Sequence, residues 1–170
     1  MNDANMKAET DLILTRVVDV PCHLIWKAWT TPSLLEPWFC PRPYGSKVVQ
    51  MDVRPGGIFH VLILDPEGNE LEGGPGCYLE VVENERLTWT SALCAGYRPV
   101  AINTDSQGCG AFPLTATLTL EALGEGSTRY TARALHANAE DAKKHEAMGF
   151  YDGWSTVLDQ LVEYIKTNLM

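Results

Sequence analysis

Two histidines near the end of the chain have the residue type and position best suited to chemistry. The first, His136, follows an alternating run over residues 128–135. That alternation predicts a strand whose inward face carries Tyr130 and His136. An inward imidazole can bond a ligand carbonyl or serve as a base. The alternative is a structural histidine that caps a helix or bonds a backbone group, and the sequence leaves both open.

The second histidine, His145, follows nine residues later. On a straight helix, at 100° per residue, it faces away from Trp154 and towards solvent. Only a break at Gly149 would turn it inward. No H-x-x-x-H or similar pairing accompanies the two histidines, so we predict no metal site. No G-x-x-x-x-G-K or G-x-G-x-x-G motif is present either, and we expect no cofactor.

The five cysteines do not form a recognisable framework. Their number is odd, their spacings are wide, and no C-x-x-C pair occurs among Cys22, Cys40, Cys77, Cys94 and Cys109. Free thiols in a reducing cytoplasm are the simpler interpretation. Cys94 or Cys109 would be a nucleophile only if His136 activated it, and no nucleophile–base–orienter set is visible.

Aromatic side chains are the candidates for a binding site. An irregular segment at residues 94–112 is predicted to form a lid, because loops of this length are usually functional or mobile. Within it, Arg98 is the candidate for a ligand carboxylate. The alternative for each aromatic residue is simple core packing. The predicted ligand-binding residues are Trp38, Phe59, Tyr78, Trp89, Tyr97, Arg98, His136, Tyr151 and Trp154.

The elements that must position these residues follow from hydrophobic periodicity. A strand is predicted at 11–18, and a helix begins near Pro21 and ends before Pro32. From residue 47 the period changes to two, with tight turns at Arg54-Pro55-Gly56-Gly57 and at 124–126. Sequential hairpins imply an antiparallel meander in an α+β domain. The predicted strands are 48–53, 58–64, 77–82, 87–93, 113–121 and 128–135.

The strongest helical pattern lies at the C-terminal end. Asn138 is a suitable cap for it, and Gly149 and Gly153 each cost about 1 kcal/mol relative to alanine. A kink near Gly149, or a close approach to the sheet, would explain the glycines. One continuous helical face is predicted through Ala147, Tyr151, Trp154, Leu158, Leu161 and Ile165. A long helix laid across a bent sheet leaves a partly filled hollow, which suits a small ligand.

Length and charge restrict the function. A chain of 170 residues fits one domain, which we place at 11–170 after a disordered tail at 1–10. The net charge of −9 argues against nucleic acid or an anionic membrane as partner. No apolar run reaches the roughly 18 residues that span a bilayer, and the polar N-terminus lacks a secretory signal. We therefore expect a cytoplasmic protein; a homodimer is compatible with exposed edge strands.

The chain resembles the START-like helix-grip (SRPBCC) superfamily, and within it the branch named for the activator of the Hsp90 ATPase. The resemblance covers nearly the whole chain, with its elements in family order. It implies a curved sheet of six to seven strands around a long C-terminal helix, with short N-terminal helices. The segments that carry it are 20–30, Pro37-Trp38, 52–59, 76–81, 86–90 and Gly153-Trp154.

Three functional hypotheses follow. The first is a binding or carrier protein for a small, largely apolar or aromatic molecule held in an internal cavity. The second is a cyclase- or hydrolase-like enzyme using the same pocket, with His136 as base. The third, which rests on the family name alone, is a module that stimulates a chaperone ATPase. Fold-level resemblance does not decide among them.

Overall fold

A computed structural model describes residues 9–71, 74–101 and 112–170. Its main element is an antiparallel sheet in the order β1-β10-β9-β6-β5-β3-β2, with β4 paired to β3. The strands are β1 (Asp11–Val18), β2 (Gly45–Met51), β3 (Ile58–Leu64), β4 (Glu70–Leu71), β5 (Gly76–Val82), β6 (Arg86–Thr90), β9 (Leu114–Ala122) and β10 (Thr128–His136). The predicted α+β meander is confirmed. The two-residue β4 brings the sheet to eight strands, beyond the six to seven predicted.

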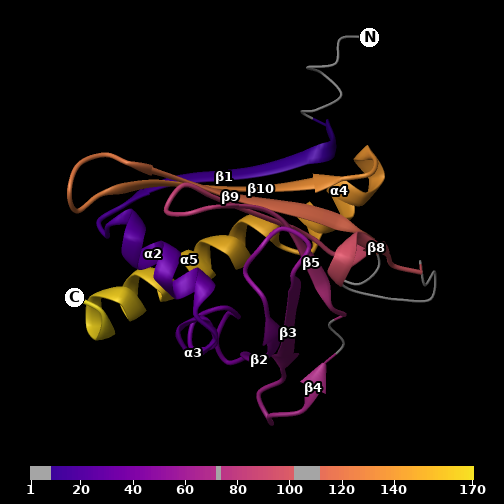
Figure 1. Ribbon diagram of the computed structural model, residues 1–170, viewed down its shortest axis with the longest axis horizontal. Coiled ribbons are helices and arrows are strands. Elements are labelled where there is room, and N and C mark those ends of the chain that lie inside the picture. Colours follow the sequence, from indigo (N-terminus) through magenta and orange to yellow (C-terminus); the bar gives the residue numbers. More distant parts are fainter. Residues whose placement is uncertain (1–8, 72–73, 102–111) are drawn as a thin grey trace.

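The sheet is strongly bent. In Figure 1, β2 and β3 stand steeply to β1, β10 and β9, while the C-terminal helix α5 (Phe150–Asn168) runs along β1, β10 and β9. Register shifts lie between Val48 and Gln50 on β2 and between Tyr78 and Glu80 on β5. Such bulges bend a strand and increase its twist. The sheet therefore curves around α5, which is the helix-grip arrangement.

Strand β1 shows how sequence alternation sets the faces of the sheet. Leu12 is buried, whereas Ile13 and Val17 are exposed on the outer face. Arg16, on the inner face, reaches across to α5 and pairs with Asp159 at 2.8 Å. The strand lies antiparallel beside β10, with Asp11 opposite Leu135. The N-terminal strand thus pairs with the last strand of the meander, a partner that the sequence did not specify.

Two short helices, α2 (Cys22–Thr30) and α3 (Pro32–Leu35), cover one part of the concave face. Pro21 is the N-cap of α2, one position before the first turn in which we expected it. Pro32 is the first residue of α3, where a missing backbone N–H costs nothing. Ile25, Ala28 and Trp29 are buried by α2 at helical spacing.

The C-terminal helical segment is divided in two. Helix α4 (Ala139–Ala147) is capped by Asn138, whose side chain accepts from the backbone N–H of Asp141 at 2.8 Å. Gly149 then takes a left-handed conformation, with φ of 95°, before α5 (Phe150–Asn168). Glycine adopts this conformation without the penalty that a Cβ brings. The predicted single face is therefore wrong at its start: Ala147 belongs to another helix, and Tyr151 is 40% exposed.

The turn between β2 and β3 explains the Arg54-Pro55-Gly56-Gly57 motif. A Cβ at Gly57 would lie 1.9 Å from the backbone oxygen of Asp52, so only glycine fits. Gly56 has a φ of 82°. Its backbone carbonyl accepts a hydrogen bond from the N–H of Gly96 at 2.8 Å. The motif thus holds a tight turn and anchors a later segment on it.

The larger hydrophobic core lies between α5, α2 and the concave face of the sheet. Its buried members include Trp29, Trp38, Tyr78, Tyr130 and Leu161. No helix among the described residues is long and apolar enough to cross a membrane. Residues 1–8 of the predicted tail lie outside the described residues. Thr10, also assigned to that tail, is held in place, because its carbonyl contacts the ring of His136.

Candidate functional site

A hollow of about 330 Å³ lies between the start of α5, helix α2 and strands β6 and β9. We call it the aromatic cavity. It reaches the surface at Met148, which is 45% exposed. The described residues of its wall include no Asp, Glu, Lys or Arg side chain. The lining residues are Trp29, Phe39, Pro41, Trp89, Leu114, Ala116, His145, Met148, Gly149, Phe150, Gly153, Trp154 and Val157.

The cavity separates two groups of packed rings. On one side, Trp29 contacts Trp89 and Phe39, with ring centroids 5.2 Å and 5.9 Å apart. On the other side, Phe150 contacts His145 at 5.2 Å and Trp154 at 5.7 Å. Aromatic pairs at such separations are held in fixed relative orientations. The two groups of rings therefore border a space that the described part of the chain leaves unfilled.

Gly153 contributes directly to this space. A Cβ built at Gly153 would meet no atom within 4 Å, although the residue lies within α5, where alanine is favoured by about 1 kcal/mol. Helix propensity and close packing therefore give no reason for glycine here. The open space beside its Cα is part of the cavity.

The histidines form a bonded pair at one end of the cavity. Nε2 of His136 lies 2.8 Å from Nδ1 of His145, and Nδ1 of His136 lies 2.9 Å from the carbonyl oxygen of Thr10. Phe112 packs against both rings, at 5.6 Å and 5.5 Å. The break at Gly149 produces this arrangement, because a continuous helix would turn His145 away from Trp154.

Hydrogen-bond chemistry fixes the protons of the uncharged pair. A carbonyl only accepts, so Nδ1 of His136 donates to Thr10. Nε2 of a neutral His136 must then accept, and Nδ1 of His145 donates to it. Nε2 of His145 is left as a bare acceptor, without a partner among the described residues. Burial, together with the neighbouring His136, lowers the pKa of His145 to about 4, so this ring is uncharged at neutral pH.

His136 therefore serves the site indirectly. It is inward and buried, as predicted, but both of its ring nitrogens are engaged within the chain. The predicted role of His136 as a base facing the ligand is thus corrected: the ring on the cavity wall is His145. The structural alternative for His136, bonding to a backbone group, is what the contact with Thr10 shows.

The other predicted residues divide into three sets. Trp89 and Trp154 line the cavity. Trp38, Phe59 and Tyr78 are buried in the core behind its wall, with Phe59 in ring contact with Trp89 at 5.5 Å. The remaining residues, Tyr97, Arg98 and Tyr151, are exposed and are not part of the wall.

Of the predicted lid, residues 94–101 do not line the cavity, whereas Phe112 at its other end packs against His145 of the wall. Residues 94–101 form the turn η1 (Ala95–Tyr97) and a small ladder of β7 (Leu93–Cys94) with β8 (Arg98–Pro99). The ring of Tyr97 lies against Gly56, in the β2–β3 turn. Residues 102–111, including Cys109, lie outside the described residues. In the described chain, Arg98 is therefore placed away from the aromatic cavity.

Of the ring-bearing residues of the wall, four were absent from the sequence prediction: Trp29, Phe39, His145 and Phe150. Trp29 falls within the helix predicted between Pro21 and Pro32, but it was not assigned to a site. Phe150 was missed because the helical face was drawn through Gly149, which shifted the expected inward position to Tyr151. The prediction lacked the positive φ of Gly149, which separates α4 from α5. The two glycines at 149 and 153 in an otherwise helical pattern were the sequence signal for such a break.

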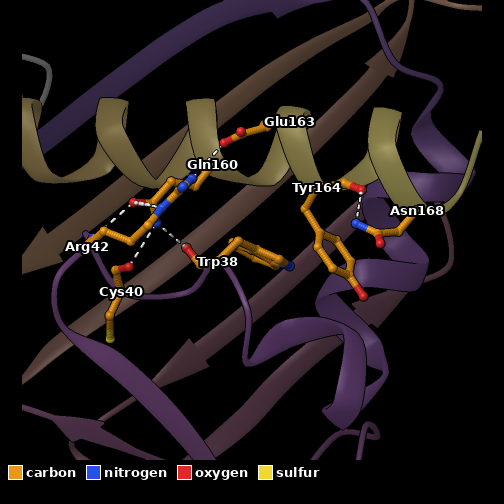
Figure 2. Close-up of polar contacts among 7 residues, drawn as sticks. All are labelled: Trp38, Cys40, Arg42, Gln160, Glu163, Tyr164 and Asn168. Atoms are coloured by element: carbon orange, nitrogen blue, oxygen red, sulfur yellow. Dashed lines mark hydrogen bonds and ion pairs between the residues drawn. The ribbon is translucent and has the colours of Figure 1, made fainter.

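A second hollow, of about 250 Å³, is a polar groove along the other end of α5. Figure 2 shows Gln160 at its base, bonded to the corner that precedes β2. Its amide nitrogen donates to the carbonyls of Trp38 and Cys40, and its oxygen accepts from the backbone N–H of Arg42 at 2.9 Å. These groups satisfy one another, so they secure the corner and leave little for a ligand.

Metal and disulfide chemistry find no support in the described chain. No cluster of three or more His, Cys, Asp or Glu side chains there is placed to hold an ion. No disulfide joins its cysteines, Cys22, Cys40, Cys77 and Cys94. The aromatic cavity with its histidine pair is therefore the candidate site.

Comparison with known proteins agrees with this architecture. The model of the Activator of Hsp90 ATPase homolog 1-like family matches residues 19–166. The chain belongs to this family. Among curated proteins, no sequence matched the chain.

Solved structures extend the relationship. A crystal structure of a protein from Nitrosomonas europaea is 42% identical, with a TM-score of 0.83 over 94% of this chain and 96% of that chain. An NMR structure from Arthrobacter aurescens is 20% identical, with a TM-score of 0.76 over 99% and 91%. A crystal structure from Mycobacterium smegmatis is 23% identical, with a TM-score of 0.71 over 95% and 94%. The last two show the fold alone.

Proposed function

We propose that this family member is a binding or carrier protein for a small, largely apolar or aromatic molecule held in the aromatic cavity. The observation that carries the proposal is the hollow of about 330 Å³ with aromatic walls and one uncharged imidazole. Pockets for small molecules are typically concave and mostly apolar, with a few placed polar groups, and begin at about 300 Å³.

The cost of keeping this space open supports the proposal. Side chains in a protein interior normally pack to high density, and a void forfeits the contacts its lining would make. Here the hollow opens beside Gly153, where a Cβ would meet no atom within 4 Å. Proteins usually depart from good packing and local propensity at functional sites.

Ligand capture is the direct test. The purified chain is examined by mass spectrometry under native and denaturing conditions for a co-purified small molecule, then screened by thermal shift with uncharged aromatic compounds. A ligand present at 100 times its dissociation constant stabilises the folded state by about 2.7 kcal/mol. We expect a clear rise in melting temperature. Absence of any shift across a broad, saturating panel would contradict the proposal.

The histidine pair favours a second candidate, an acid–base enzyme of the cyclase or hydrolase type acting in the same cavity. In such an enzyme the base is His145 and not His136, because Nε2 of His145 has no hydrogen-bond partner among the described residues. Once a ligand is known, conversion is followed by mass spectrometry in the native chain and in His145→Phe. Turnover that disappears in the variant while binding persists would favour the enzyme over the carrier.

A further inference from the structure

The acceptor nitrogen of His145 restricts the kind of ligand that the cavity suits. Among the side chains of the wall, those of Trp29, Trp89 and Trp154 carry only N–H donors, and Met148 has a weak sulfur acceptor. Among the described residues of the wall, the imidazole of His145 is therefore the only strong side-chain acceptor. Its orientation is secured by the 2.8 Å bond to His136 on β10.

The choice of tautomer is made outside the cavity. The Thr10 carbonyl fixes the proton of His136 on Nδ1, and His136 in turn fixes the proton of His145 on Nδ1. A ligand therefore meets a nitrogen lone pair whose direction is set before it binds. Preorganisation of this kind lowers the cost of forming the hydrogen bond. The ring is also uncharged at neutral pH, since burial lowers its pKa.

The same features disfavour an anionic ligand. A carboxylate brought into this cavity would leave water, would meet no Lys or Arg side chain among the lining residues that the structure describes, and would face the lone pair of His145. A buried charge without a partner is strongly unfavourable. A phenol, by contrast, is uncharged at neutral pH, has an aromatic body, and donates one hydrogen bond.

We propose that the aromatic cavity takes an uncharged ligand of the phenol class, whose hydroxyl group donates a hydrogen bond to Nε2 of His145. This inference rests on the proposed binding function and specifies its ligand chemistry. The apolar body of the ligand lies between the two aromatic walls, and its hydroxyl group lies at the end of the cavity formed by His145 and Phe150.

Three probes of similar shape test the inference: 2-naphthol, 2-methoxynaphthalene and 2-naphthoate, titrated calorimetrically at pH 7.5. A net hydrogen bond makes 2-naphthol bind roughly threefold to tenfold more tightly than its methyl ether. In His145→Phe, which keeps an aromatic ring but removes the acceptor, we expect the two neutral probes to bind equally. We expect 2-naphthoate to bind most weakly to the native chain.

Two further variants test whether the preference for the hydroxyl group depends on the histidine pair and not on a general effect of a His→Phe substitution. His136→Phe leaves His145 in place but removes the group that fixes its tautomer, so the preference for the hydroxyl should fall without vanishing. His23→Phe, at an exposed position on α2, is the matched control and should leave all affinities unchanged. The thermal unfolding of each variant establishes that it is folded before titration.

The outcomes separate the inference from the proposed function. A hydroxyl preference that is lost in His145→Phe supports both. Three results overturn the inference and leave the binding function standing. The neutral probes bind without that preference, His145→Phe shows the same preference as the native chain, or 2-naphthoate binds most tightly. If none of the three probes binds to the native chain, the proposed function falls as well.

Discussion

At the scale of single residues, the site depends on which polar atoms are satisfied. Both ring nitrogens of His136 form hydrogen bonds within the chain, whereas Nε2 of His145 has no partner among the described residues. The sequence identified His136 as inward from strand alternation alone. Residue types alone do not predict that Nε2 of His136 contacts His145, because that contact depends on the backbone conformation of Gly149.

The lowered pKa of His145 predicts a pH dependence of stability. The folded-state pKa, about 4, lies below the ordinary value of 6.5, so the unfolded chain binds the extra proton first. The stabilisation is fully present above pH 6.5 and is lost as the pH falls towards 4. The contribution is about 2 kcal/mol after discounting for partial exposure. Urea unfolding of the native chain and His145→Phe at pH 7.5 and 4.5 measures it.

We expect the native chain to lose more unfolding free energy between these two pH values than His145→Phe. The facing titratable neighbour is His136 on β10; Asp141, on α4 itself, is bonded to Asn138, and Asp152 on α5 is exposed. Asp11 and Arg133 pair on the outer face of the sheet. Equal losses in the two proteins would show that His145 titrates normally.

Two buried tyrosines give a contrasting pair. The hydroxyl of Tyr78 is buried without a hydrogen-bond partner among the described residues, whereas that of Tyr130 accepts from the indole N–H of Trp154 at 3.3 Å. Tyr78→Phe should leave stability unchanged or raise it by up to about 1 kcal/mol, because it removes an unsatisfied group. Tyr130→Phe should cost about 1 kcal/mol. Chemical denaturation measures the unfolding free energy of both variants. A larger loss in Tyr78→Phe than in Tyr130→Phe would contradict the prediction and show that the hydroxyl of Tyr78 has a partner.

At the scale of elements, most of the fold follows from periodicity. The strand at 58–64 was predicted with the bounds that β3 shows, and β1 likewise. The prediction is wrong at the C-terminal helix, where it placed one uninterrupted hydrophobic face across Gly149. Hydrophobic spacing does not reveal a left-handed residue, since α4 and α5 each remain helical. The prediction of a kink near Gly149 named the right residue, but not its effect on Phe150 and Tyr151.

Gly149→Ala tests the break itself. A Cβ at φ of 95° is strained, although no neighbouring atom lies within 4 Å, so we expect a loss of about 1 to 2 kcal/mol in unfolding free energy. The strain favours straightening the α4–α5 junction, which would move His145 away from His136. Binding of any cavity ligand should weaken in parallel, as titration calorimetry would show. Gly124→Ala, at a φ of 121° in the β9–β10 turn, is a control that should cost stability without weakening binding.

At the scale of the whole molecule, the cavity results from a bent sheet and a helix that cannot fill its curve. The sequence predicts such a hollow, and two of the predicted ligand-binding residues, Trp89 and Trp154, line it. The prediction also placed Trp38 and Tyr78 there, which pack the core instead. Aromatic type alone does not separate wall from core, because that depends on which rings α2 and α5 bring opposite each other.

Gly153 allows the most direct measurement of the central claim, that this hollow exists to hold a ligand. Gly153→Leu projects a side chain into the cavity, and any loss from the added bulk is offset by better helix propensity. The control is Thr156→Leu, on the exposed side of α5. Calorimetric titration of all three proteins with 2-naphthol should show binding to the native chain and to Thr156→Leu, and at least tenfold weaker binding to a folded Gly153→Leu. Undiminished affinity in Gly153→Leu would contradict the account.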